Sequence, residues 1–312
     1  MHLNDIGDDS RRQYIDARAT FESWEAAKRQ LASVRANLRW KTVSGTEYLI
    51  SASGRTEKSL GARSPETEQI YAGLVARKSV AIGRLAGLEQ QMERQQKLNR
   101  ALRVGRAPQI LVDLLRAFDE AGIADHFLTI GTHALYAYEA AAGARFEAEA
   151  LATRDVDLLW DTNRRIKFVA QMRLMQTSLL GILQRVDPSF AIKERQLYTA
   201  VNAAGFEVDV VRREPKDLDP HPLNMTDDED EIYAVPAPRA EVLLSSPKLS
   251  AIIVSASGHM ARMTTVSPMA FAAFKRWMAG QQDREGLKRK RDLMQAELVE
   301  KLVDEYLPQL ER

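Results

Sequence analysis

Two acidic residues interrupt a stretch that otherwise has the composition of a hydrophobic strand, "TRDVDLLWD" at residues 153–161. Asp155 and Asp157 are two positions apart, so on a strand their side chains point to the same face and their charges repel each other. A divalent cation between them would offset this repulsion, because Mg²⁺ takes oxygen ligands and is commonly held by a few carboxylates together with substrate phosphates. The pair therefore predicts a site for Mg²⁺ or Mn²⁺.

A third carboxylate is available at Asp209, which interrupts the β-branched stretch "FEVDVV". We expect this stretch to be the second strand of a hairpin that lies beside the first acidic strand. Three carboxylates on one face make a two-metal site plausible, in which one ion activates an attacking hydroxyl and the other holds a triphosphate. The residues also allow a purely structural interpretation, in which the aspartates form ion pairs with Arg154, Arg212 or Arg213.

The segment "LTIGTHALYAYE" upstream of the aspartates has the features of a phosphate-binding turn. Gly131 would let a phosphate approach the backbone, Thr132 offers a hydroxyl, and a helix starting at His133 would present free N–H groups and the positive end of its dipole. Thr132 could instead cap that helix. We expect His133 and the aromatic residues that follow it to be buried.

One basic residue of the last third could also reach a nucleotide. Lys275 lies in "FAAFKRWM", an amphipathic stretch whose aromatic residues would form the apolar face of a helix. From such a helix the lysine could contact a phosphate, or it could be solvated.

Composition limits the class of protein. The chain has 312 residues, 45% of them hydrophobic, with 44 Lys+Arg against 43 Asp+Glu and no cysteine. These values indicate a packed protein of about two domains, without disulfides, thiolate nucleophiles or cysteine-bound zinc. Neither a signal peptide nor an apolar run of membrane-spanning length is present, so we expect a cytoplasmic protein that does not use a membrane.

Three segments are expected along the chain. Residues 1–105 read as a helical accessory unit, with a second long helix that starts at Ser64-Pro65, a short hairpin at 40–53 and a basic loop at 54–64. Residues 106–235 alternate strands and helices and form the expected catalytic core, with one helix at 163–186 and a solvated acidic run at 227–231. Residues 236–312 read as two or three antiparallel strands followed by helices. The fold class is α+β, with a mixed, mostly antiparallel sheet and flanking helices.

The short motifs "IGT", "DVD" and "VDV" resemble the hydrophobic-Gly-Ser, Asp-x-Asp and final Asp motifs of the DNA polymerase β-like nucleotidyltransferase superfamily. Longer stretches, such as "KSLGARSPETE" and "TRDVDLLWD", resemble a little-characterised bacterial nucleotidyltransferase-fold family over nearly the whole chain. Two details depart from the usual pattern: Thr132 replaces Ser or Gly, and Gly131 and Asp155 are farther apart than is common.

The resemblance implies Mg-dependent transfer of a nucleoside monophosphate from an NTP such as ATP to a hydroxyl of a protein, an RNA or a small molecule. It implies that Asp155, Asp157 and Asp209 hold the metals and that Asp209 helps to deprotonate the acceptor. Gly131 and Thr132 would hold the β- and γ-phosphates.

Two other functions stay open on the sequence. An Asp-x-Asp pair also occurs in glycosyltransferases, where it holds Mn²⁺ and a sugar nucleotide, but these enzymes would need a large parallel α/β domain before the motif. An inactive nucleotide-binding or antitoxin-like module would be expected to lack at least one of the three acids, and all three are present.

Overall fold

A computed structural model describes residues 2–34, 37–53, 56–215, 223–226, 228 and 231–310. The chain divides into two compact units, which we describe separately. Unit 1 consists of residues Met1–Arg11 and Leu102–Arg312, and unit 2 of residues Arg12–Ala101. Residues 106–235 and 236–312 thus both lie in unit 1.

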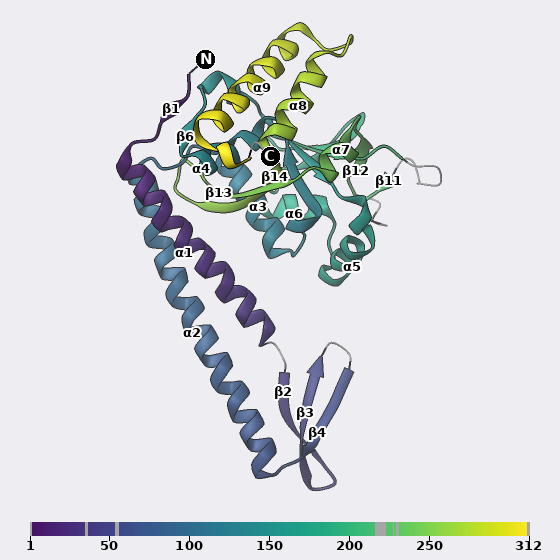
Figure 1. The fold of residues 1–312 in the computed structure, drawn as a ribbon. Coiled ribbons are helices and arrows are strands. Elements are labelled where there is room, and N and C mark those ends of the chain that lie inside the picture. Colours follow the sequence, from purple (N-terminus) through teal and green to yellow (C-terminus); the bar gives the residue numbers. More distant parts are fainter. Residues whose placement is uncertain are drawn as a thin grey trace. The chain divides into compact units, whose positions relative to one another are not determined.

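Unit 2 combines two long antiparallel helices with a three-stranded antiparallel sheet (Figure 1). Its elements are α1 Asp8–Ser33, β2 Asn37–Val43, β3 Thr46–Ser53, β4 Thr56–Ala62 and α2 Pro65–Ala101. The two helices pack through small and aromatic residues that are buried, among them Ala17, Phe21 and Ala81. At one end of this pair, the amide of Gln13 donates a hydrogen bond of 3.0 Å to Asn99.

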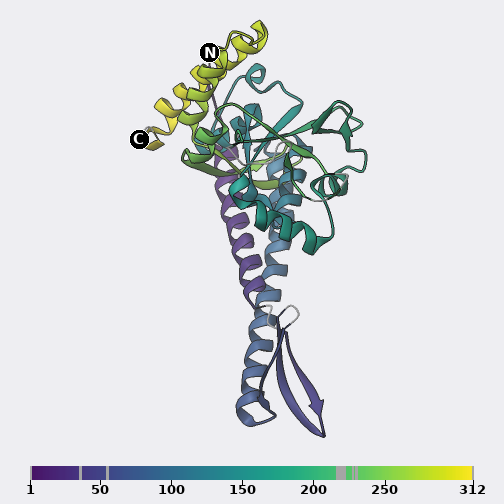
Figure 2. The ribbon, with the colours of Figure 1, turned by 90° about the vertical axis from the view of Figure 1, so that its right-hand side faces the viewer.

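The sheet of unit 2 packs against the first part of α2 (Figure 2), where the rings of Trp40 and Tyr71 lie 5.8 Å apart. The expected helix start at Pro65 is confirmed. The expected basic loop is wrong over 56–62, because this stretch pairs with β3 as a third strand. Its polar residues are compatible with that position, since an edge strand can face water.

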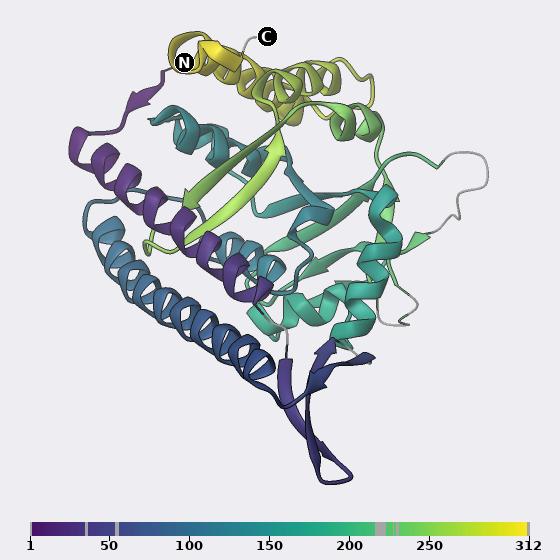
Figure 3. The same ribbon diagram turned by 60° about the horizontal axis from the view of Figure 1, so that its bottom comes forward.

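The main sheet of unit 1 is mixed (Figure 3), which confirms the predicted fold class. Its strands are β5 Phe127–Ile130, β7 Asp155–Trp160, β8 Ala191–Lys193, β9 Gln196–Val201, β10 Glu207–Arg212, β11 Leu223–Asn224 and β12 Tyr233–Pro236. Strand β10 runs parallel to β7 and β12 and antiparallel to β9, while β5 is antiparallel to β7. The predicted hairpin of β9 and β10 is present, and β7 and β10 are neighbours.

Helices cover both faces of this sheet. They are α3 Gln109–Glu120, α4 Leu135–Ala142, α5 Arg165–Met175, α6 Leu179–Val186, α7 Ala240–Ser245, α8 Pro268–Ala279 and α9 Gly286–Tyr306. Alternate residues of β7 point to opposite faces, so Val156 and Leu158 join a core with α3, α5 and α6. Leu159 joins a second core with α4, α8 and α9. Asp155 and Asp157 therefore belong to the α4, α8 and α9 face.

Two further strand pairs complete unit 1. The short pair is β1 Asn4–Asp5 with β6 Ala144–Arg145, and the longer antiparallel pair is β13 Lys248–Val254 with β14 Met260–Val266. The expectation of strands throughout 239–266 is wrong over Ala240–Ser245, which forms α7. This segment contains Ala, Glu and Leu, which favour a helix, and Pro247 prevents its continuation.

The single helix expected at 163–186 is also wrong, because α5 ends at Met175 and α6 begins at Leu179. Gln176 has a left-handed backbone (φ 50°), and the Ser178 hydroxyl caps α6. Glu231 adds a second cap, since its carboxylate accepts a hydrogen bond from the backbone N–H of Leu179 at 3.1 Å. The acidic run is therefore not wholly solvated: Glu231 is buried, and Asp227, Glu229 and Asp230 lie outside the described residues.

Candidate metal and nucleotide site

The parallel pairing of β7 and β10 brings the three predicted carboxylates together. In this register Asp157 lies directly opposite Asp209, and Asp155 precedes Asp157 by two residues on the same face. One carboxylate oxygen from each residue lies within 4.8 Å of the others. This cluster has the oxygen chemistry that a hard divalent cation requires.

The carboxylates of this cluster have no basic ion-pair partner in the part of the chain that the structure describes, so the ion pairs considered with Arg154, Arg212 or Arg213 are not formed. Burial, together with the adjacent charge of Asp155, raises the pKa of Asp157 from 3.8 to about 7. Burial also raises the pKa of Asp209, against a hydrogen bond from Thr199 that lowers it. Without a cation, burial therefore disfavours the charged forms of Asp157 and Asp209.

Two threonine hydroxyls donate hydrogen bonds to two carboxylates of the cluster, those of Asp155 and Asp209. Thr153 donates a hydrogen bond to Asp155. Thr199, on the neighbouring strand β9 and almost fully buried, donates one of 2.5 Å to Asp209. Sequence reasoning did not single out either threonine. Thr199 could have been found by placing the predicted hairpin in register, because it lies directly opposite Asp209.

Gly131 directly follows the neighbouring strand β5 and lies against the cluster. Ile130 pairs with Asp157, so Gly131 comes next to the Asp157 side chain despite the long separation in sequence. A Cβ atom at Gly131 would lie 2.0 Å from Oδ2 of Asp157, and the backbone there has φ +67°. Only glycine fits both conditions, so this residue gives the carboxylate its space.

The turn after Gly131 is a 3₁₀ helix over Gly131–Ala134, and α4 begins only at Leu135. The expected helix start at His133 is thus two residues early. The Thr132 hydroxyl does not cap the helix; it accepts a hydrogen bond of 3.1 Å from the buried amide of Gln295 on α9. His133 is buried as expected, its pKa is lowered to about 4 by burial, and its Nδ1 lies 2.9 Å from the carbonyl oxygen of Asp155.

Lys275 is buried and is held in a cluster of three charges. Its Nζ lies 2.8 Å from Oδ1 of Asp292 on α9, and Arg284 contacts the other oxygen of Asp292 at 2.7 Å. The solvated lysine considered from the sequence is therefore wrong. Lys275 and Arg284 are close enough to Asp157 to lower its pKa in part. Arg284 and Asp292 were missed, since both lie in stretches that read as charged surface.

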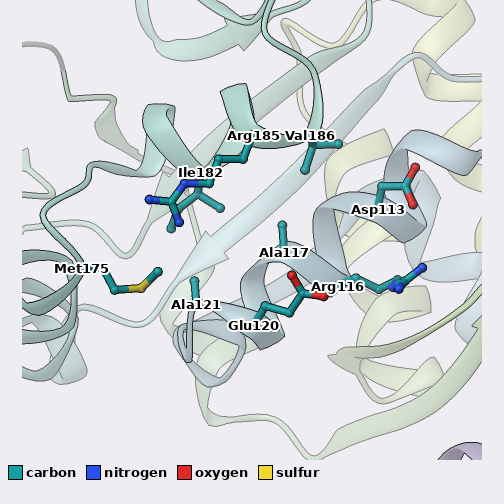
Figure 4. Close-up of a pocket in the computed structure, with 9 residues that line it drawn as sticks. All are labelled: Asp113, Arg116, Ala117, Glu120, Ala121, Met175, Ile182, Arg185 and Val186. Carbon is teal, nitrogen blue, oxygen red and sulfur yellow. The ribbon is translucent and has the colours of Figure 1, made fainter. Parts of the chain in front are cut away.

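A separate hollow of about 440 Å³ lies between α3 and α6 (Figure 4). Arg116 and Glu120 stand on its α3 side, and Ile182 and Arg185 lie opposite them on α6. None of the three aspartates lines this hollow. It therefore plays no part in the site.

Comparisons with known proteins bear on the class of the site. A family model described as a nucleotidyltransferase matches residues 109–312, which is more than half of the chain and includes all the residues of the cluster. Searches of curated proteins and of solved structures found no match. Within the described ranges, none of the helices is both long and apolar enough to cross a bilayer.

Proposed function

The chain belongs to this nucleotidyltransferase family, and on that premise we propose that it transfers a nucleoside monophosphate from an NTP to a hydroxyl acceptor with the help of Mg²⁺ or Mn²⁺. The observation that carries the proposal is the meeting of three carboxylates within 4.8 Å on neighbouring strands. In this reaction the acceptor oxygen forms a bond to the α-phosphorus, the bond between the α-phosphorus and the bridging oxygen breaks, and pyrophosphate leaves.

The donor set of the cluster suits hard divalent cations. Asp155, Asp157 and Asp209 offer only oxygen ligands and have no competing ion pair among the described residues. Bound cations would lower the pKa of the acceptor hydroxyl and offset phosphate charge. We assign Asp155 and Asp157 to the triphosphate side and Asp209 to the acceptor side, where its carboxylate takes the hydroxyl proton. The threonine hydroxyls keep Asp155 and Asp209 in the required orientation.

The triphosphate would be bound from the side of α4, α8 and α9. Gly131 lies against Asp157 and Thr132 follows it in the chain. The Thr132 hydroxyl can still donate its hydrogen to a phosphate oxygen, because it only accepts from Gln295. Lys275 has one hydrogen bond to Asp292, which leaves further ammonium hydrogens for a phosphate. Asp292 would then hold Lys275 and Arg284 in place as a positioning residue.

The two alternatives predict different chemistry. An Asp-x-Asp glycosyltransferase would consume a sugar nucleotide, whereas the mixed sheet and the family match favour a nucleotidyltransferase. An inactive binding module would bind Mg·NTP without transfer. Incubation with each labelled NTP, a sugar nucleotide and a cell lysate separates the three outcomes by what becomes labelled.

The sharpest test uses two acids of one strand. Asp209→Asn removes the acceptor-side charge, so transfer should fall at least about 100-fold while Mg·NTP binding measured by calorimetry changes little. Glu207→Gln is the matched control, because Glu207 lies two residues away on the same face but is paired with Lys193 at 2.7 Å. Full transfer by Asp209→Asn protein would contradict the assignment, as would equal losses in both variants.

A further inference from the structure

The near-zero net charge of the chain conceals an uneven distribution. Unit 2 carries 16 Lys+Arg against 9 Asp+Glu, a net charge of +7, whereas unit 1 carries 28 against 34, a net charge of −6. Within unit 2 the whole surplus lies in residues 28–88, which contain 11 basic and 4 acidic residues. We call this stretch the basic region. It comprises the end of α1, the three-stranded sheet and the first two-thirds of α2.

Three of the four acidic residues of the basic region form ion pairs, and the fourth, Glu66, accepts a hydrogen bond from the Ser64 hydroxyl. Glu57 is shared by Arg39 and Lys41 on the sheet. Glu47 and Glu68 both contact Arg63. The surplus therefore rests on other cations, and those that are exposed and have no carboxylate partner among the described residues include Arg29, Lys58 and Lys78.

The basic region is large compared with a single small anion. Its basic residues occur on α1, on the sheet and on α2, where Arg77, Lys78 and Arg84 lie within about 10 Å along the helix axis, at 1.5 Å per residue. Cations dispersed over a helix end, a sheet and a second helix match a ligand with regularly repeated negative charges. The phosphodiester backbone of a nucleic acid has this property.

We propose that the basic region binds the backbone of a nucleic acid, and that a nucleic acid strand is the acceptor class, its terminal hydroxyl being the attacking group. The assignment of a nucleic acid strand as acceptor rests on the proposed nucleotidyl transfer. Binding of the backbone by the basic region rests on the charge distribution alone. Exposed cations with free hydrogens replace the counterions of the phosphates, so the affinity should fall steeply with salt.

Binding is tested on the full chain in EDTA, where the carboxylate cluster holds no metal. Fluorescence anisotropy with a 20-nucleotide RNA and a DNA of the same sequence, at 50–200 mM KCl, gives Kd and its salt dependence. The triple variant Arg29→Gln, Lys58→Gln, Lys78→Gln should raise Kd at least about 10-fold and reduce the slope of log Kd against log[KCl] by about 2.

The matched control is the triple variant Arg94→Gln, Lys97→Gln, Arg100→Gln. These residues are also exposed, lie on α2 and have no carboxylate partner among the described residues, but they are outside the basic region. Their loss should change Kd less than about 3-fold. Equal losses in both triple variants would overturn the proposal. It would also be overturned if the wild type bound neither strand at 50 mM KCl, or bound only vesicles containing phosphatidylserine.

The proposal that a nucleic acid strand is the acceptor is tested by label transfer to the 3′ end of the strand that binds. The basic-region triple variant should raise KM for this strand at least about 10-fold with kcat unchanged, and a strand lacking the 3′-hydroxyl should not be labelled. Asp155→Asn/Asp157→Asn protein should still bind the strand in EDTA. If a different acceptor is labelled while the bound strand stays unlabelled, the strand is not the acceptor and that part of the proposal is overturned. If no acceptor is labelled although the strand still binds, the result contradicts the proposed function instead.

Discussion

Replacing Gly131 by alanine tests whether the Asp157 carboxylate occupies the space beside this backbone. The new Cβ would lie 2.0 Å from Oδ2 and 3.0 Å from Cγ of Asp157, so the carboxylate must move by about an ångström or more. Alanine at φ +67° adds backbone strain of about 1–2 kcal/mol, and crowding of a packed side chain adds about 1–3 kcal/mol. We therefore expect a loss of about 2–5 kcal/mol in the free energy of unfolding.

Gly205 provides a matched control, because it has φ +75° and a Cβ there would meet nothing within 4 Å. Gly205→Ala should lose only the backbone part, about 1–2 kcal/mol, in urea unfolding of the metal-free protein. In an Asp157→Ala background, the cost of Gly131→Ala should fall to that of the control. If Gly131→Ala costs the same with and without the Asp157 carboxylate, the close approach of these two residues is refuted.

Three further predictions concern the charges of the site. Because the pKa of Asp157 is raised from 3.8 to about 7, the metal-free protein loses stability as the pH rises through this range. Asp157→Asn should therefore stabilise the protein by up to about 4 kcal/mol at pH 8 and by less than half as much at pH 5. Urea unfolding in EDTA measures this, and an equal gain at both pH values would contradict it. Thr199→Val removes the hydrogen bond to Asp209 and should slow transfer about 10-fold with Mg·NTP binding retained, whereas Thr199→Ser should keep the wild-type rate. Lys275→Met leaves the buried Asp292 with one cation fewer and should lower stability by about 3 kcal/mol and raise KM for NTP. Adding Asp292→Asn should restore part of the stability but not KM, and recovery of both would mean that Lys275 has only a structural role.

The main elements of the core could be predicted because their signals are local. Hydrophobic strands, the turn at residues 202–205 and the Ser-Pro start of α2 each lie within a few residues of sequence. The prediction of a cluster of Asp155, Asp157 and Asp209 needed one further assumption, that the strand carrying Asp209 lies beside the strand carrying the other two. The family match confirms the resemblance to nucleotidyltransferases.

The features that the sequence did not reveal depend on contacts between distant segments. Asp292 lies on a helix with many charged residues, and only the approach of α8 shows that it is buried beside Lys275. Glu231 is indistinguishable from its acidic neighbours until α6 is placed with its N-terminus against it. β4 has too few apolar residues to be recognised, since an exposed edge strand carries little hydrophobic pattern.

The pairing of β7 with β10 has a consequence for how such chains can change in length. The backbone hydrogen bonds between β7 and β10 fix the position of Asp157 relative to Asp209. Those between β5 and β7 fix the position of Asp157 relative to Gly131. Segments that connect these strands can therefore gain or lose residues without moving the carboxylates, whereas a shift of one position within a strand would turn them to the opposite face. The distance between motifs along the chain is thus a poor criterion for recognising this site, and their register in the sheet is the better one.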